Sequence, residues 1–264
     1  MLKKFFVAAI VTLLVTSVQI AAAEDFDWSK APRFGTKADL ARYIESERRK
    51  GNTKIRVILT NGLRITDRAD FANISVCINV DGTYYPNNDG AMPIDYEIKE
   101  YPGTHVANAY RNGDISGLSA EERQLYNIAV GIVDEANKRP SELEKARYIH
   151  DEICRRVLEY RVENDRNKTA IGALIDGYAQ CQGFTDAFYM LGRMCGLNVG
   201  RIGGTKDNGK ILHAWNWITF SDGKSYCVDV TLDDGYNYDK WFLSTYEDMK
   251  SNYWCEWSII PNLQ

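Results

Sequence analysis

The sequence has 264 residues, of which 45% are hydrophobic and 26% are charged, and its formal net charge is −4. This balance is typical of soluble globular proteins, and the length allows one large domain or two modest ones. No block rich in lysine and arginine occurs, so the composition argues against nucleic acid as a partner.

The first 23 residues have the pattern of a secretory signal peptide. A basic head, "MLKK", precedes the apolar run "FFVAAIVTLLVTSVQIAAA", which ends in small residues before the polar "EDF". We expect cleavage after Ala23, a secreted or extracytoplasmic location, and no membrane span in the mature chain. Loss of Lys3 and Lys4 would change the formal charge from −4 to −6. The alternative is an uncleaved membrane anchor, because the apolar run is nearly long enough to cross a bilayer.

Residues 24–115 predict a small α+β region. A helix is expected to begin after Thr36 and to stop at Gly51, and "KIRVILT" is typical of a strand. In "IDYEIKEY", apolar and polar residues alternate as on a half-buried strand. We interpret "PGTH" as a loop that leaves His105 beside no reactive group, and we attach no chemistry to this region.

Residues 116–264 predict a second domain, which is helical first and rich in strands later. Ser119-x-x-Glu122 and Ser141-x-x-Glu144 are capping-box patterns, and each precedes apolar residues at helical spacing. A third helix is expected from Cys181 to about Cys195. The segments "NVGRI", "ILHAWNWITF" and "KSYCVDV" are typical of strands, and the aromatic tail that follows is typical of wall and core packing.

Six cysteines are scattered along the chain, without the dense framework of a small disulfide-stapled domain. They are Cys77, Cys154, Cys181, Cys195, Cys227 and Cys255. Cys181 differs from the others because it lies where a loop becomes a helix, in "YAQCQGFTDAF". The pairing of the remaining cysteines stays open.

Cys181, His213 and Asp229 follow one another in the order that a thiol nucleophile, its base and the group orienting the base would need. The other two histidines have simpler interpretations, since His150 is typical of a partly buried helix position. A helix start favours an anion, and a nearby imidazolium lowers a thiol pKa further. We therefore expect Cys181 to act as an ionised nucleophile, and we expect its backbone N–H to be available to donate a hydrogen bond to an oxyanion.

The loop between the two predicted strands decides whether His213 and Asp229 share a face, because side chains alternate along a strand. A two-residue loop at Asp222-Gly223 would put Asp229 on the wrong face. A three-residue loop, 221–223, pairs Phe220 with Lys224 and His213 with Thr231, and it makes Asp229 a diagonal neighbour of His213 on the same face. We predict the three-residue loop, with the side chains of the opposite face pointing toward a core: Leu212, Ala214, Ile218 and Phe220.

Three ordered motifs resemble those of the transglutaminase-like superfamily, within the papain-like fold. They are Cys181-Gln182-Gly183-Phe184, His213-Ala214-Trp215-Asn216 and Val228-Asp229-Val230-Thr231. The resemblance covers roughly residues 141–249 and implies an α+β core in which the helix bearing Cys181 packs on an antiparallel sheet bearing His213 and Asp229. It also implies that Cys181 attacks an amide carbonyl to form a thioester. The further oxyanion or site-lining group is left open among Gln180, Tyr178 and Trp215.

The resemblance predicts a cysteine peptidase, amidase or acyl transferase acting on a peptide or protein, and the signal-peptide pattern predicts that it is exported, with cell-wall peptide as one substrate class. We expect no cofactor and no metal. One alternative is an inactive module that binds cell-wall or surface polymers. A second alternative, zinc held by Cys181, His213 and Cys227, lacks the paired spacing of structural zinc sites.

Overall fold

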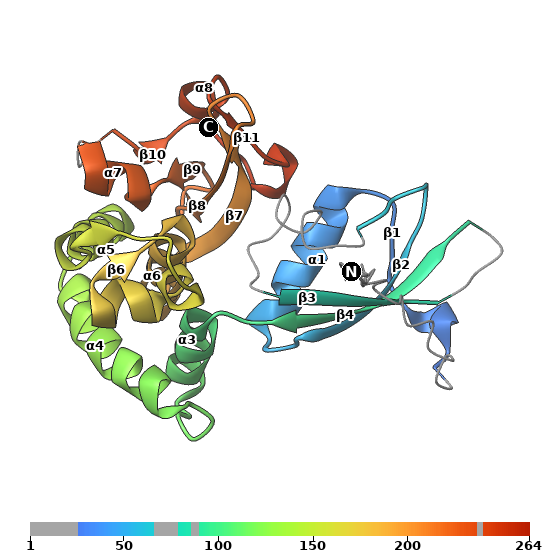
Figure 1. Cartoon of the computed structure of the whole chain (residues 1–264), viewed down its shortest axis with the longest axis horizontal. Helices are drawn as coiled ribbons and strands as arrows, with labels where there is room; N and C mark the ends of the chain where they lie inside the picture. Colours follow the sequence, from blue (N-terminus) through green and yellow to red (C-terminus); the bar gives the residue numbers. More distant parts are fainter. Residues whose placement is uncertain (1–25, 66–78, 86–89, 237–239) are drawn as a thin grey trace, which may run out of the picture.

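The computed structural model describes residues 26–65, 79–85, 90–236 and 240–264 (Figure 1). The predicted signal peptide, 1–23, and Cys77 lie outside the described residues. Within the described ranges, no helix has both the length and the apolarity needed to cross a bilayer.

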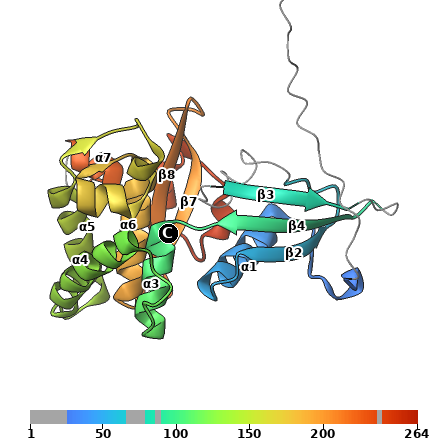
Figure 2. The same cartoon turned by 60° about the horizontal axis from the view of Figure 1, so that its bottom comes forward.

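The N-terminal part is a four-stranded sheet with one long helix against it (Figures 1 and 2). Helix α1 begins after Thr36, whose side chain accepts a hydrogen bond from the Asp39 N–H, as the sequence predicted. The alternating residues of β4 are buried under it, which confirms the predicted half-buried strand. In sheet order the strands are β1 (Arg33–Phe34), β2 (Lys54–Leu59), β4 (Met92–Lys99) and β3 (Asn79–Tyr84), and α1 spans Lys37–Arg49.

The segment "PGTH" is not a loop but the start of helix α3 (Pro102–Asn112), so the sequence interpretation of it was wrong. Proline at the first position of a helix loses no hydrogen bond and has a suitable φ. Gly103 is needed there because a Cβ would lie 2.5 Å from the Asp186 carboxylate, to which its own N–H donates. His105 is held by Glu122 at 2.7 Å on the exposed side.

Helix α6 (Cys181–Met194) is the centre of the larger part of the chain. It packs against the helices α3 and α5 (Glu142–Arg156) and against the strands β7 (Asn198–Lys206) and β8 (Ile211–Thr219). All its residues but Gln182 are buried. The predicted helices after Ser119 and Ser141 are confirmed as α4 (Ala120–Asn137) and α5 (Glu142–Arg156). Because α3 also packs on α6, a helix that precedes residue 116 contacts this core; the boundary predicted there stays a prediction.

The main sheet has the strand order β10-β9-β8-β7-β11 among the described residues. One face packs on α6 through Val199 and Ile218, and the other faces α1 through Ile202, Trp215 and Trp217. The elements of this part are β5 (Glu159–Tyr160), β6 (Tyr178–Ala179), β7 (Asn198–Lys206), β8 (Ile211–Thr219), β9 (Ser225–Val228), α7 (Val230–Tyr236), β10 (Phe242–Ser244), α8 (Tyr246–Met249) and β11 (Tyr253–Trp254). Short helical turns occupy Trp28–Lys30, Asp165–Lys168, Gly172–Asp176 and Trp257–Ile259. This is the α+β, papain-like arrangement that the sequence predicted.

The hairpin between β8 and β9 has the predicted three-residue loop. Phe220 N–H donates to the Lys224 carbonyl, Thr219 pairs with Ser225, and Gly223 has a φ of +82°, as the end of such a loop requires. The predicted pairing of His213 with Thr231 is wrong, because β9 ends at Val228 and α7 begins at Val230. Asp229 is therefore a residue between strand and helix, not a strand neighbour of His213.

A buried chain of charges joins the two parts of the molecule. Arg48 of α1 bonds both oxygens of Glu100, at 2.5 and 2.7 Å, and Arg201 of β7 bonds Asp186 of α6 at 2.8 Å. Arg201 also approaches Glu100 at 3.5 Å, so the four side chains alternate in sign. Burial opposes ionisation of Glu100, but the charges of Arg48 and Arg201 lower its pKa to about 2.

Candidate active site

Cys181 is the first residue of α6, at a helix start built by a close contact with the preceding loop. The Gln180 N–H donates to the Asn167 carbonyl, and Gln180 is the N-cap of the helix. A Cβ on Gly183 would lie 2.4 Å from that same Asn167 carbonyl oxygen, so the glycine of the Cys-x-Gly motif permits this approach. The Cys181 side chain thus lies at the N-terminal, positive end of the helix dipole.

His213 and Asp229 form a buried hydrogen-bonded pair, with Nε2 and Oδ2 2.7 Å apart. His213 is 7% exposed and Asp229 1% exposed. β9 pairs with β8 only as far as Asn216↔Val228, so the chain turns away beside His213 and brings Asp229 to it. The pair that the sequence predicted is present, although the backbone geometry that makes it differs.

Cys181 interacts with the same imidazole. Because Asp229 occupies Nε2, Nδ1 is the ring nitrogen left for the thiol. Burial lowers the pKa of His213, but the charge and hydrogen bond of Asp229 and the interaction with Cys181 outweigh it and raise the pKa to about 10. An imidazolium held in this way through neutral pH stabilises a thiolate beside it. The structure thus brings Cys181, His213 and Asp229 together.

Asp229 is fixed by groups that the sequence analysis did not identify. The Tyr253 hydroxyl donates to the same Oδ2 at 2.8 Å, and the Leu232 N–H donates to Oδ1 at 3.3 Å. The Asp229 N–H donates to the Trp241 carbonyl. Tyr253 is in the aromatic tail, where many rings do pack in cores, so no local pattern distinguishes it.

Tyr160 is a second group that the sequence analysis missed. Burial, the charge of Cys181 and a hydrogen bond with its side chain raise the pKa of the Tyr160 hydroxyl to about 12, although a hydrogen bond from the Cys181 backbone N–H lowers it. The hydroxyl interacts with both the side chain and the backbone N–H of Cys181. That N–H is where an oxyanion would be bound, so the Tyr160 hydroxyl lies beside the same position.

The three oxyanion or site-lining candidates named from the sequence lie in different surroundings. The Gln180 side-chain nitrogen is buried and has no hydrogen-bond partner among the described residues, so a donor next to the nucleophile is unused. The Tyr178 ring faces Arg161, whose guanidinium carbon is 3.8 Å from the ring centroid. Trp215 is 1% exposed and stacks on His213 with ring centroids 6.0 Å apart, so it supports the imidazole from the core side.

The other histidine in a helix has a structural role. His150 is fully buried and bonds Asp151 through Nδ1 at 2.9 Å and Asp233 through Nε2 at 3.1 Å. Asp233 belongs to α7, which begins directly after Asp229, so this contact holds α7 against α5. The cysteines other than Cys181 in the described ranges are free and buried: Cys154, Cys195, Cys227 and Cys255.

A metal site is not formed by these residues. Within the described ranges, no group of three or more His, Cys, Asp and Glu side chains is placed to hold an ion. Cys227 is fully buried in the core with Trp217 and Ile259. The zinc alternative therefore has no support.

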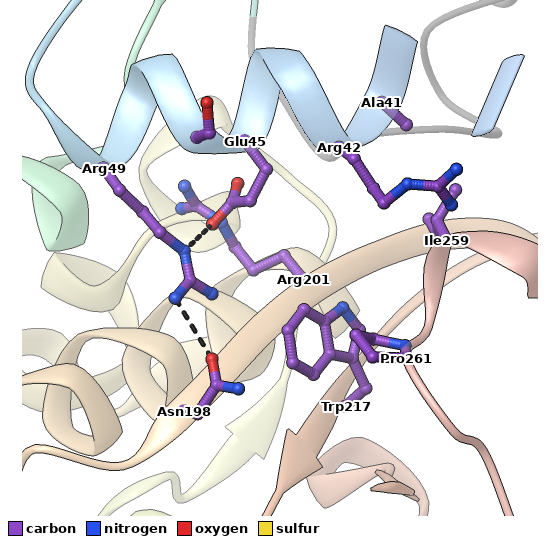
Figure 3. Close-up of a pocket in the computed structure, with 10 residues that line it drawn as sticks. Ala41, Arg42, Glu45, Arg49, Asn198, Arg201, Trp217, Ile259 and Pro261 are labelled. Carbon is purple, nitrogen blue, oxygen red and sulfur yellow. Dashed lines mark hydrogen bonds and ion pairs between the residues drawn. The ribbon is translucent and has the colours of Figure 1, made fainter. Parts of the chain in front are cut away.

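A cavity of about 220 Å³ lies away from this site, between α1 and the outer face of β7 and β8 (Figure 3). Trp217 forms one wall of the cavity. The Arg49 guanidinium also lines the cavity and donates hydrogen bonds to Glu45, Asn198 and the Val199 carbonyl. Cys181, His213 and Asp229 do not line it. The reactive groups and this cavity are thus separate features.

Residues 128–231 match the family described as the transglutaminase-like superfamily. The matched range includes Cys181, His213 and Asp229. A comparison with curated proteins found no match.

Three solved structures share a low similarity with the chain. A TGase is 14% identical over 69% of this chain and 51% of its own, with a TM-score of 0.39. A candidate protease from Parabacteroides distasonis is 12% identical over 66% and 39%, with a TM-score of 0.30. A candidate cysteine protease from Cytophaga hutchinsonii is 13% identical over 68% and 72%, with a TM-score of 0.31. The chain thus spans about half the length of the first and less of the second.

Proposed function

Since residues 128–231 belong to the transglutaminase-like superfamily, we propose that this protein is a thiol-dependent peptidase, amidase or acyl transferase that acts on peptide-type amides. One observation carries the proposal: the imidazole of His213 bonds Asp229 at 2.7 Å and interacts with the Cys181 thiol on its other side. A nucleophile, a proton carrier and an orienting carboxylate are then joined in series.

In the acylation step, the Cys181 thiolate attacks the amide carbonyl carbon and a C–S bond forms. The oxyanion that develops is stabilised by the Cys181 N–H and the Tyr160 hydroxyl, and the unpaired Gln180 amide is a further donor. Collapse of the intermediate breaks the C–N bond, and the His213 imidazolium gives its proton to the departing amine. A thioester on Cys181 and a neutral His213 remain.

In the second step, water or a primary amine attacks the thioester. His213 takes the proton of the nucleophile, the C–S bond breaks, and the thiolate–imidazolium pair is restored. Asp229 keeps the same ring tautomer in both steps because its carboxylate holds Nε2–H. We propose hydrolysis as the main outcome, because water is abundant and the sequence marks no dedicated amine site.

We further propose that the protein acts outside the cytoplasm, on the basis of the sequence of residues 1–23. The substrate would then be a peptide or protein of the envelope or exterior, and cell-wall peptides are the first class to try.

The experiment incubates the purified chain with cell-wall peptides and a labelled primary amine and identifies the products by mass spectrometry. Shortened peptides support hydrolysis, and amine adducts support transfer. Both should disappear in Cys181→Ala and persist in Cys195→Ala, which removes a buried free thiol at the far end of the same helix. If no Cys181-dependent product forms from any peptide, the inactive binding module is the better account.

A further inference from the structure

Leu212 is 74% exposed, although the sequence predicted that it points toward a core. Its neighbours on the same face, Ala214 and Ile218, are buried as expected. The difference arises because α6, which covers this face of the sheet, begins at Cys181. A large apolar side chain is thus left open just beyond the start of the nucleophile helix, on the face of β8 opposite to His213.

The strand register shows that Leu212 is part of a row. It pairs with Thr205 of β7, which pairs in turn with Trp254 of β11, so the three side chains lie on one face of three adjacent strands. Trp254 is 53% exposed. At about 5 Å between strands, the row extends for about 10 Å across the sheet. We call Leu212, Thr205 and Trp254 the apolar shelf.

The apolar shelf is on the face of the sheet that carries the nucleophile. Cys181 forms a small buried cluster with Ala214 and Tyr101, and Ala214 is two residues along β8 from Leu212. Two residues of a strand span about 7 Å. Beyond Trp254 the shelf continues into a hollow of about 420 Å³ whose walls include Thr205 and Asn252.

A second exposed apolar segment lies near Cys181. Leu158, Tyr160 and Val162 are 77%, 51% and 64% exposed, and the Tyr160 hydroxyl interacts with Cys181. Large exposed apolar side chains that lie in one row, as Leu212 and Trp254 do across Thr205, mark a binding surface, whereas scattered exposed apolar residues need no explanation.

We propose that the apolar shelf binds a large aliphatic or aromatic side chain of the substrate, close to the amide that Cys181 attacks. This inference rests on the proposed function and names its substrate class: peptides with an apolar residue near the cleaved bond. An extended peptide places side chains of one face about 7 Å apart. A residue about two positions from the carbonyl at Cys181 therefore reaches the shelf. The occupant is a substrate segment, because the shelf is continuous with the nucleophile's surroundings and a permanent partner there would cover Cys181.

The test compares two peptide amides that differ only in leucine or serine two residues from the cleaved bond. Wild type should favour the leucine peptide by about 10-fold in kcat/KM. This is a small preference for an apolar contact, because the shelf is open to solvent. Leu212→Ser and Trp254→Ser should each reduce this preference to about 3-fold or less. The control is Leu143→Ser, which alters a 48% exposed leucine on α5 and should keep the full preference.

A measurement that needs no turnover separates failure of this inference from failure of the proposed function. Two peptidyl chloromethyl ketones that differ only in the same leucine or serine alkylate Cys181, and the rate of each is measured. Each rate is divided by the rate at which iodoacetamide alkylates the same variant, which corrects for differences in thiol reactivity. A leucine preference that depends on Leu212 supports the shelf even if no peptide is cleaved. Equal rates for the two reagents in wild type overturn it. The inference is also overturned if the wild-type protein is a dimer that Leu212→Ser dissociates while the leucine preference stays the same, because the surface would then bind a second copy of the chain.

Discussion

Replacing Asp229 by asparagine should cause a large fall in the pKa of His213. In the native protein that pKa is raised from 6.5 to about 10, against the effect of burial. The rise corresponds to a preference of about 5 kcal/mol for the imidazolium. Without the carboxylate charge, desolvation still lowers the pKa of His213 and only the interaction with Cys181 still raises it. We therefore expect the titration midpoint of His213 to fall by about 3 pH units or more.

The assay is an NMR titration of protein with ¹⁵N-labelled histidine, in which only three imidazoles contribute signals. His213→Gln identifies the resonance, and the signals of His105 and His150 serve as internal references. The titration needs no substrate, so it tests the electrostatics independently of activity. A native His213 midpoint near 6.5, or one unchanged in Asp229→Asn, would refute the ion-pair reasoning.

The pH dependence of stability follows from the same value. Because the pKa of His213 is higher in the folded state, its contribution to the free energy of unfolding is complete below about pH 6.5 and is lost as the pH rises through about 10. The Asp229→Asn variant should lose this alkaline decline in the free energy of unfolding.

Four further changes test individual contacts. Tyr253→Phe removes one of two hydrogen bonds to Asp229 Oδ2 and should lower kcat/KM by about 10-fold or more, with unchanged circular dichroism; wild-type kinetics would show that the hydroxyl is dispensable. Tyr160→Phe should lower kcat by about 100-fold if its hydroxyl binds the oxyanion, whereas a change confined to KM would exclude that role. Gly183→Ala should reduce the free energy of unfolding by about 1–3 kcal/mol in urea, because the new Cβ meets the Asn167 carbonyl; a stable variant would contradict the packing. Glu100→Gln removes the negative charge that both Arg48 and Arg201 contact and should reduce the free energy of unfolding by about 3–5 kcal/mol. In wild type, the contribution of Glu100 to the free energy of unfolding is complete above about pH 4.5 and is lost as the pH falls through about 2. The variant should lack this pH dependence.

The part of the site that the sequence predicted is the part encoded in short, local patterns. A cysteine at a helix start, a histidine and an aspartate around one hairpin, and the three-residue loop of that hairpin can each be inferred from neighbouring residues. The prediction failed where β9 gives way to α7 at Asp229, since the residues 228–231 would fit a strand equally well.

The missed groups reach the site through the tertiary fold. Tyr253 is 24 residues beyond Asp229, and Tyr160 is 21 residues before Cys181, so neither can be predicted from a fixed spacing in the sequence. Leu212 was placed toward a core because strand alternation gives its face but not the point at which the covering helix begins. Pro102 was interpreted as a loop signal because proline and glycine are frequent in turns; proline is equally suited to the first position of a helix, and the contact of Gly103 with Asp186 is a tertiary one.

The most direct test of the central proposal is the mass of the intact protein after rapid acid quenching with an excess of peptide substrate. We predict a population heavier by the acyl part of the peptide, with the modification mapped to Cys181 and released by neutral hydroxylamine, as a thioester requires. Turnover without such an adduct in Cys181-containing protein, or turnover that survives in Cys181→Ala, would contradict the account.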